Sequence, residues 1–219
     1  IQKRNEVLIG WSKDGFHWNR ENKKPFLPVS EDFHAWNAGN VQSTAGNPLI
    51  VGDSLYFYVS GRYNSKPKHD SNFATGLAML RRDGFVSMRA GRKEGYVEIK
   101  TQIPANGNYL FVNADVKGTL AIEVLDDNGQ PMEGFTKKDC ISMQKSDKTK
   151  QIISWKKHPG VTSLVGKTVR LKFYLNQADI YAFWISAWQT GESGGYTGGG
   201  GPGLSDKGID TPIDKLKNN

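Results

Sequence analysis

The stretch VLIGWSKDGFHW, Val7–Trp18, returns in degraded form as GLAMLRRDGFVSM, Gly76–Met88. With Asp14 aligned on Asp83, the two copies lie 69 residues apart. Each copy is an apolar run, a charged pair, Asp-Gly and then a run that carries an aromatic residue. Glycine after aspartate supplies the positive φ of a tight turn, so each copy predicts two strands joined as a hairpin. A hairpin that recurs at a long spacing is typical of radial or stacked β architectures.

The sequence between the two copies also predicts strands. Pro48–Val51 is an apolar run, Gly52-Asp53 predicts a turn, and Leu55–Ser60 alternates between two faces. Leu55, Phe57 and Val59 would share one face of that strand. From one Asp-Gly-Phe to the next there would be about four strands, which is one blade of a β-propeller.

Residues 92–190 predict a different body, because the strands are longer and alternate more cleanly. Turns are expected at Asp127-Asn128-Gly129 and at Asn176–Asp179. The expected strands are Tyr96–Lys100, Tyr109–Asn113, Thr119–Leu125, Lys150–Trp155, Thr168–Leu175 and Ile180–Ala187. Strands at such spacing without helical periodicity favour a β-sandwich.

The predicted fold is therefore all-β, with three parts. Residues 1–91 would form the final blade or blades of a propeller, and residues 92–190 a β-sandwich. Residues 191–219 are rich in glycine and then in lysine and aspartate, which predicts a flexible tail; the alternative is an extended strap that packs on the fold, with Tyr196 as the candidate docking point.

Composition narrows the classes of protein to consider. The chain of 219 residues has no apolar run long enough for a transmembrane helix. It opens at Ile1 almost directly into a predicted strand, without a signal peptide, which suggests a processed chain or a fragment.

The single cysteine of the chain, Cys140, excludes an internal disulfide. The net charge of +7 comes from scattered lysines and arginines, which favours a solvated surface over nucleic acid; a site for polyanions, including anionic glycans, is the alternative.

The densest group of polar and aromatic residues is HAWNAGNVQS, residues 34–43. A sugar ring stacks on an aromatic platform and pairs its hydroxyl groups with planar amides, so we predict that Trp36, Asn37, Asn40 and Gln42 bind a saccharide. Arg62 would bind a carboxylate or sulfate on the same substrate. The alternative is structural: Trp36 packs between blades, the amides cap loop backbone, and Arg62 forms a salt bridge.

Other residues with chemical potential favour structural roles. His34 and His69 are expected at the surface, and Asp14 and Asp83 are expected to hold their own turns. The run Asp126–Gly129 lacks the spacing of a calcium loop, and the Gly-rich stretch 198–203 lacks the pattern of a phosphate loop. No metal or cofactor is expected.

The strings DGFHW, WNAGNVQS, VGDSLYFYVSGR and TGLAMLRRDGF resemble the closing part of glycoside-hydrolase-like proteins with five-bladed propellers. These are the relatives of invertase and levanase (glycoside hydrolase family 32) and the arabinanase and xylosidase clan. The later strings NYLFVNAD, EVLDDNG and YAFWIS resemble the β-sandwich that follows the propeller in invertase-like proteins. The resemblance covers roughly residues 5–190.

The resemblance implies a bacterial protein, extracellular or periplasmic, that acts on or binds an oligo- or polysaccharide. Enzymes of this kind use two carboxylates in early blades, and nothing in this chain matches their Asp-Pro-Asn, Arg-Asp-Pro or Glu-Cys motifs. No catalytic residue is therefore assigned, and catalytic carboxylates are expected before Ile1. The chain would function joined to an N-terminal propeller portion or a companion chain, because one blade leaves open edges. The alternatives are a non-catalytic carbohydrate-binding module and a structural module of an extracellular assembly.

Overall fold

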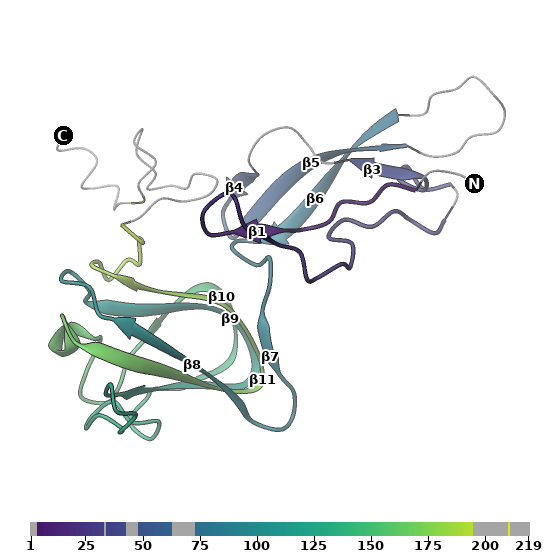
Figure 1. Ribbon diagram of the computed structural model, residues 1–219. Coiled ribbons are helices and arrows are strands. Elements are labelled where there is room, and N and C mark those ends of the chain that lie inside the picture. The colour runs from purple at the N-terminus through teal and green to yellow at the C-terminus, as the bar shows by residue number, and fades with distance from the viewer. Residues whose placement is uncertain (1–3, 33, 43–47, 63–72, 195–209, 211–219) are drawn as a thin grey trace. The chain divides into compact units, whose positions relative to one another are not determined.

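The structure, a computed structural model, describes residues 4–32, 34–42, 48–62, 73–194 and 210 (Figure 1). The described residues form strands, turns and one short 3-10 turn, with no α-helix among them, so the all-β prediction is confirmed. The chain divides into two compact units between Leu80 and Arg81. We expected the change of character near residue 91.

The strands are numbered in chain order. They are β1 (Trp11–Ser12), β2 (Trp18–Asn19), β3 (Asn40–Gln42), β4 (Leu49–Val51), β5 (Ser54–Arg62), β6 (Phe73–Arg81), β7 (Met88–Ala90), β8 (Gly95–Gln102), β9 (Tyr109–Leu125), β10 (Met143–Ile153) and β11 (Thr168–Ser186). The 3-10 turn η1 spans Thr162–Leu164.

The first unit contains a four-stranded sheet and a separate two-stranded hairpin. In the sheet, β5 pairs with β3, β4 and β6. The predicted strand–turn–strand at 48–60 is confirmed, because β4 pairs antiparallel with β5 across a turn in which Gly52 has a φ of 58°. The alternation in β5 buries Leu55 and Val59, and Val59 packs with Val29 and Val41 in a small core.

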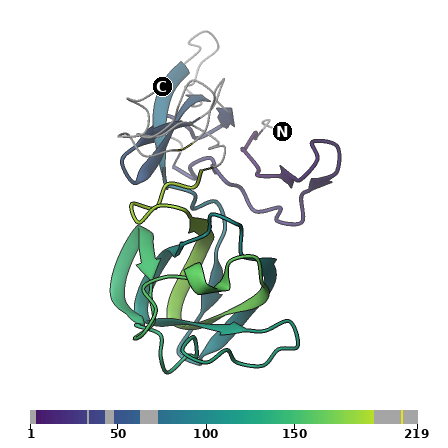
Figure 2. The same cartoon turned by 90° about the vertical axis from the view of Figure 1, so that its left-hand side faces the viewer.

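The second unit is built on one five-stranded sheet with β11 inside it. One edge of β11 pairs with β9, and β9 pairs in turn with β10. Strands β8 and β7 pair with successive parts of β11, at residues 168–175 and 178–180. The long strands β9 and β11 curve, so the sheet curls around its interior (Figures 1 and 2).

Two strand boundaries predicted from the sequence are wrong. Residues 109–125 form one strand, and so do residues 168–186. The turn expected at Asn176–Asp179 is instead a bulge, where the pairing with β9 shifts register between Asn176 and Ala178 and Gln177 takes a φ of 43°. A bulge bends a strand without ending it, so the polar residues mark a bend in the sheet.

Apolar side chains on the inside of the curl form the core of the second unit. Every second residue of β9 from Leu110 to Val116 is buried, and the same holds from Leu171 to Leu175 in β11. The indole of Trp155 is buried here and donates a hydrogen bond from Nε1 to the carbonyl of Ile122. The thiol of Cys140 lies in the same core, where burial raises its pKa.

The two Asp-Gly-Phe copies are not equivalent, contrary to our prediction. The first copy joins β1 to β2, and Gly15 has the expected positive φ of 79°. In the second copy Asp83 itself takes the positive φ, at 52°, and the strand that follows, β7, pairs with β11 rather than with β6. This segment therefore leads from the sheet of the first unit into the sheet of the second.

Residues 187–194 and Asp210 are the described part of the chain after β11, and hydrogen bonds hold them within the second unit. The indole Nε1 of Trp184 donates a hydrogen bond to the carbonyl of Gly191. The carboxylate of Asp210 accepts a hydrogen bond from the backbone N–H of Ser193, and its carbonyl accepts another from Gly194. Tyr196, the expected docking residue, lies outside the described residues.

Candidate functional site

The four-stranded sheet of the first unit has two faces that differ in what covers them. The face that carries Leu55, Val59 and Gly61 is buried, and we call it the inner face. On the opposite face, the outer face, Tyr58 keeps 51% of its surface exposed. Neighbouring residues of a strand point to opposite sides, so each residue of β5 can be assigned to a face.

Trp36 lies on the inner face. A Cβ built at Gly61 would fall 2.4 Å from Cε3 of the indole, and one built at Gly76 would fall 2.3 Å from its Cη2. The indole therefore packs directly on the backbones of β5 and β6, which only glycine allows. Trp36 therefore has a packing role, as in the structural alternative given for it from the sequence. Its packing partners are β5 and β6 of its own sheet, whereas the alternative had placed it between blades.

Asn40 and Gln42 lie on the outer face instead. In the β3–β5 register, Asn40 is opposite Arg62 and Gln42 is opposite Ser60. Directly opposed residues of antiparallel strands project to the same side. The structure thus brings Asn40, Gln42 and Arg62 together, and the sheet separates them from Trp36.

Arg62 contacts an aromatic ring on the outer face. Its Cζ lies 4.4 Å from the centroid of Phe73, the first residue of β6. Phe73 is 59% exposed. This ring was missed in our sequence analysis, although the alternation in FATGLAML sets Phe73 on the face opposite Gly76. We call Asn40, Gln42, Ser60, Arg62 and Phe73 the polar end of the outer face.

The amide groups near the polar end have different surroundings. The Oδ1 of Asn40 is closed to solvent and has no hydrogen-bond partner among the described residues. Leaving such an acceptor unpaired costs about 1–3 kcal/mol. The Nδ2 of Asn37 donates to the carbonyl of Pro28 at 3.3 Å, which is the loop-capping role given as its alternative.

Beyond the polar end, the outer face carries several apolar side chains. Four exposed side chains extend it over β4 and β6: Leu49, Val51, Leu77 and Met79. They share the face of Tyr56, which lies directly opposite Leu49. We call these four residues the apolar end.

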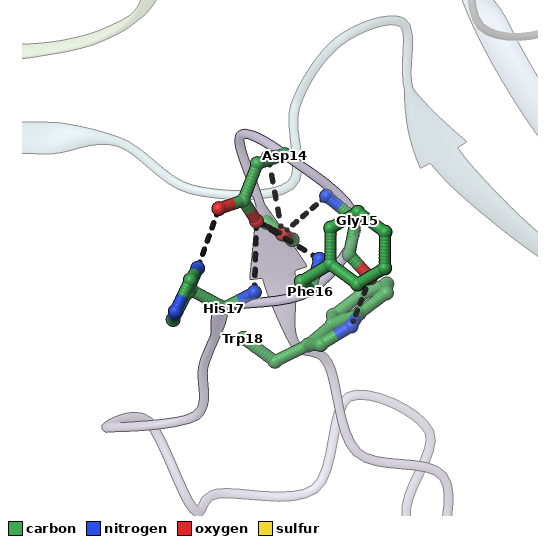
Figure 3. A network of polar contacts seen from close by, with 6 residues as sticks. Asp14, Gly15, Phe16, His17 and Trp18 are labelled. Carbon is green, nitrogen blue, oxygen red and sulfur yellow. Dashed lines mark hydrogen bonds and ion pairs between the residues drawn. The ribbon is translucent and has the colours of Figure 1, made fainter.

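The first hairpin holds a local network of polar contacts around Asp14 (Figure 3). Its Oδ1 accepts hydrogen bonds from the backbone N–H groups of Phe16, at 2.9 Å, and His17, at 2.8 Å. The Nδ1 of His17 lies 2.5 Å from Oδ2. These contacts hold the pKa of the Asp14 carboxyl well below its usual value. The largest effect comes from the backbone N–H of His17, followed by the ring of His17 and the backbone N–H of Phe16. The prediction that Asp14 holds its own turn is confirmed.

The remaining candidates are turn or surface residues. The carboxylate of Asp126 accepts a hydrogen bond from the backbone of Gln130, and Gly129 has a φ of 82°, which confirms the predicted turn. His34 is exposed, and His69 lies outside the described residues. Among the residues that can be described, no three His, Cys, Asp or Glu side chains are placed to hold a metal ion.

A second exposed surface lies on the outside of the curled sheet. Tyr96 of β8 is opposite Tyr174 of β11, with ring centroids 6.4 Å apart. The ammonium of Lys172 lies 4.2 Å from the centroid of the Tyr96 ring, which is 62% exposed. Burial and a hydrogen bond to Glu123 raise the pKa of Tyr174 to about 12, so its hydroxyl stays a donor at neutral pH. Our sequence analysis did not single out this pair.

No protein-family profile, curated protein or solved structure matched the chain. Within the described ranges, no helix is long and apolar enough to cross a membrane.

Proposed function

We propose that the chain is the C-terminal part of a secreted glycoside-hydrolase-like protein that binds or acts on a polysaccharide. In this proposal the first unit is a propeller blade, the second is a β-sandwich-like accessory unit, and the catalytic carboxylates lie in a preceding portion of the protein. The observation that carries the proposal is the polar end. There two amides, a hydroxyl, a guanidinium and an exposed ring share one face of a sheet.

The chemistry of the polar end suits a sugar. A sugar ring presents hydroxyl groups at its edge and C–H groups on its faces, and binding sites pair the first with amides and the second with aromatic rings. Asn40 and Gln42 supply the amides. Phe73 supplies the ring, in place of the indole of Trp36 that we predicted from the sequence.

The apolar end supports the blade assignment. A sheet that is apolar on both sides is expected in the middle of a stack, and propeller blades are stacked face to face around an axis. The inner face is covered by Trp36 and Val41, whereas Leu77 and Met79 are 45% and 66% exposed. In the full protein we propose that a neighbouring blade covers the apolar end.

The direct test of the function is saccharide binding by the whole chain. Phe73→Ala should weaken binding to a polysaccharide by about fivefold, since stacking on one ring contributes on the order of 1 kcal/mol. Tyr96→Ala is the matched control, because it removes an exposed ring from the other unit. Affinity electrophoresis in gels that contain different polysaccharides measures both. Equal binding by Phe73→Ala and the wild type would remove the polar end from the site.

A non-catalytic carbohydrate-binding module is the second candidate, and the tyrosine pair of the second unit favours it. Two neighbouring rings on an open sheet surface form a platform for consecutive sugar units. In that case Tyr96→Ala would weaken binding and Phe73→Ala would not. The same pair of variants therefore separates the two candidates.

A further inference from the structure

The charges of the polar end indicate which kind of saccharide it takes. We propose that this site recognises an acidic sugar unit, with Arg62 binding a carboxylate or sulfate group. The inference rests on the proposed function, because it names the substrate class of the same site.

Arg62 is the charged residue among the five that make up the polar end. Its neighbours at the polar end, Asn40, Gln42, Ser60 and Phe73, are all uncharged. Over the ranges that the structure describes, no carboxylate is bonded to the guanidinium. Elsewhere in the same unit Arg4 forms ion pairs with Glu6 and Glu31.

The contact with Phe73 orients Arg62 without using its donors. A cation–π contact attracts the charge of the guanidinium to the ring and leaves its five N–H groups available for hydrogen bonds. A carboxylate or sulfate accepts two parallel hydrogen bonds from such a fork. The guanidinium lies over the Phe73 ring, which stays 59% exposed, so the two groups offer one ligand both an apolar surface and an anion-binding group.

The surrounding groups fit the rest of such a ligand. The amides of Asn40 and Gln42 and the hydroxyl of Ser60 are suited to sugar hydroxyls. A neutral sugar would satisfy the amides and leave the guanidinium without an anion, so an acidic sugar uses the whole site.

The test compares three oligosaccharides of equal length: a neutral one, one built from uronic acids, and a sulfated one. Isothermal titration of the full chain should show tighter binding of an acidic ligand by about tenfold or more over the neutral one. If only one of the two acidic ligands binds more tightly than the neutral one, its acidic group, carboxylate or sulfate, is the group that Arg62 recognises. The preference should shrink as salt is added, because the contact is exposed.

Variants assign the preference to Arg62. Arg62→Gln should reduce affinity for the acidic ligand by about tenfold or more and abolish most of the preference for it over the neutral one. Arg62→Lys keeps the charge and loses the fork, so an intermediate affinity is expected. Arg92→Gln is the matched control, since Arg92 is exposed and the hydrogen bond it accepts, from Asn176, uses its backbone carbonyl. Thermal melting confirms that each variant is folded.

Two results would overturn the inference and leave the proposed function standing: equal affinity for neutral and acidic ligands, or an acidic preference that survives in Arg62→Gln. The wild-type comparison needs no variant, so it decides the matter even where Arg62→Gln does not fold. Failure of all three ligands to bind contradicts the proposed function itself, and the inference with it.

Discussion

The indole of Trp36 lies so close to the backbone of Gly76 that a Cβ at position 76 would fall 2.3 Å from its Cη2. This contact joins a loop residue to a strand 40 positions later in the chain. It sets Trp36 on the inner face of the sheet, away from Asn40, Gln42 and Arg62.

Gly76→Ala should therefore destabilise the first unit. The added methyl group overlaps the indole, and overpacking of this kind costs about 1–3 kcal/mol. Chemical denaturation followed by tryptophan fluorescence measures the change. Gly91→Ala is the control, because nothing lies within 4 Å of its Cβ position. A Gly76→Ala protein as stable as the wild type would mean that Trp36 does not pack as described.

Trp36→Ala and Phe73→Ala should separate stability from binding. Truncating a buried aromatic residue costs about 3–5 kcal/mol, and we expect less for Trp36 because it is 37% exposed. Phe73 is more exposed, so its loss should barely change the free energy of unfolding while it weakens saccharide binding. Melting curves and binding titrations on both variants test this. A stable Trp36→Ala protein that has lost binding would support the original prediction of Trp36 as the sugar platform.

Most of the strands could be predicted from the sequence, because alternation is a local property. Leu55, Phe57 and Val59 in β5 are an example, and Thr168–Leu175 in β11 is another. The site could be predicted only in part. The amides and Arg62 were found from residue type, but the face on which each lies depends on the pairing of β3 with β5, about 20 residues further along the chain.

Two errors in the predicted fold share a physical cause. Asp-Gly-Phe and Asn-Gln-Ala-Asp both favour positive φ, and the structure does place positive φ at Asp83 and Gln177. Positive φ serves a hairpin, a connection or a bulge equally well. Which of these forms is decided by strands distant in the sequence: β11 pairs with β9 both before and after Gln177, and with β7 directly after it.

Arg81→Ala should destabilise the second unit. The guanidinium of Arg81 donates from Nε to Oδ1 of Asn113 at 2.5 Å and from Nη2 to the carbonyl of Ala114 at 3.1 Å, and it also pairs with Asp147. Asn113 is only 1% exposed, so removal of the guanidinium leaves its buried Oδ1 without the charged donor that it has in the wild type. The expected loss is about 1.5–3 kcal/mol of unfolding free energy. Arg92→Ala, which removes an exposed arginine, should change stability little; equal losses in both variants would contradict the role of Arg81.

The stability of the second unit should fall in acid because of Asp179. Burial alone would raise the pKa of this carboxyl, but hydrogen bonds from Arg89 and Ser87 outweigh it and lower the pKa below its ordinary value. A lowered folded-state pKa gives stability that is complete above the unfolded-state pKa, near 3.8, and is lost as the pH falls through the folded-state value. Unfolding curves of the wild type and Asp179→Asn measure this loss of stability. They should run from about pH 6 to about pH 2, which extends roughly two pH units to each side of the unfolded-state pKa. If Asp179→Asn loses as much stability in acid as the wild type, the contribution lies elsewhere.

The most direct test of the account is to map a bound saccharide onto the chain. Backbone and side-chain amide signals of the labelled protein would be followed by nuclear magnetic resonance during titration with an acidic oligosaccharide. The account predicts that the shifted signals cluster at Asn40, Gln42, Arg62 and Phe73. Shifts confined to the second unit, or gathered around Trp36 on the other face of the sheet, would contradict it.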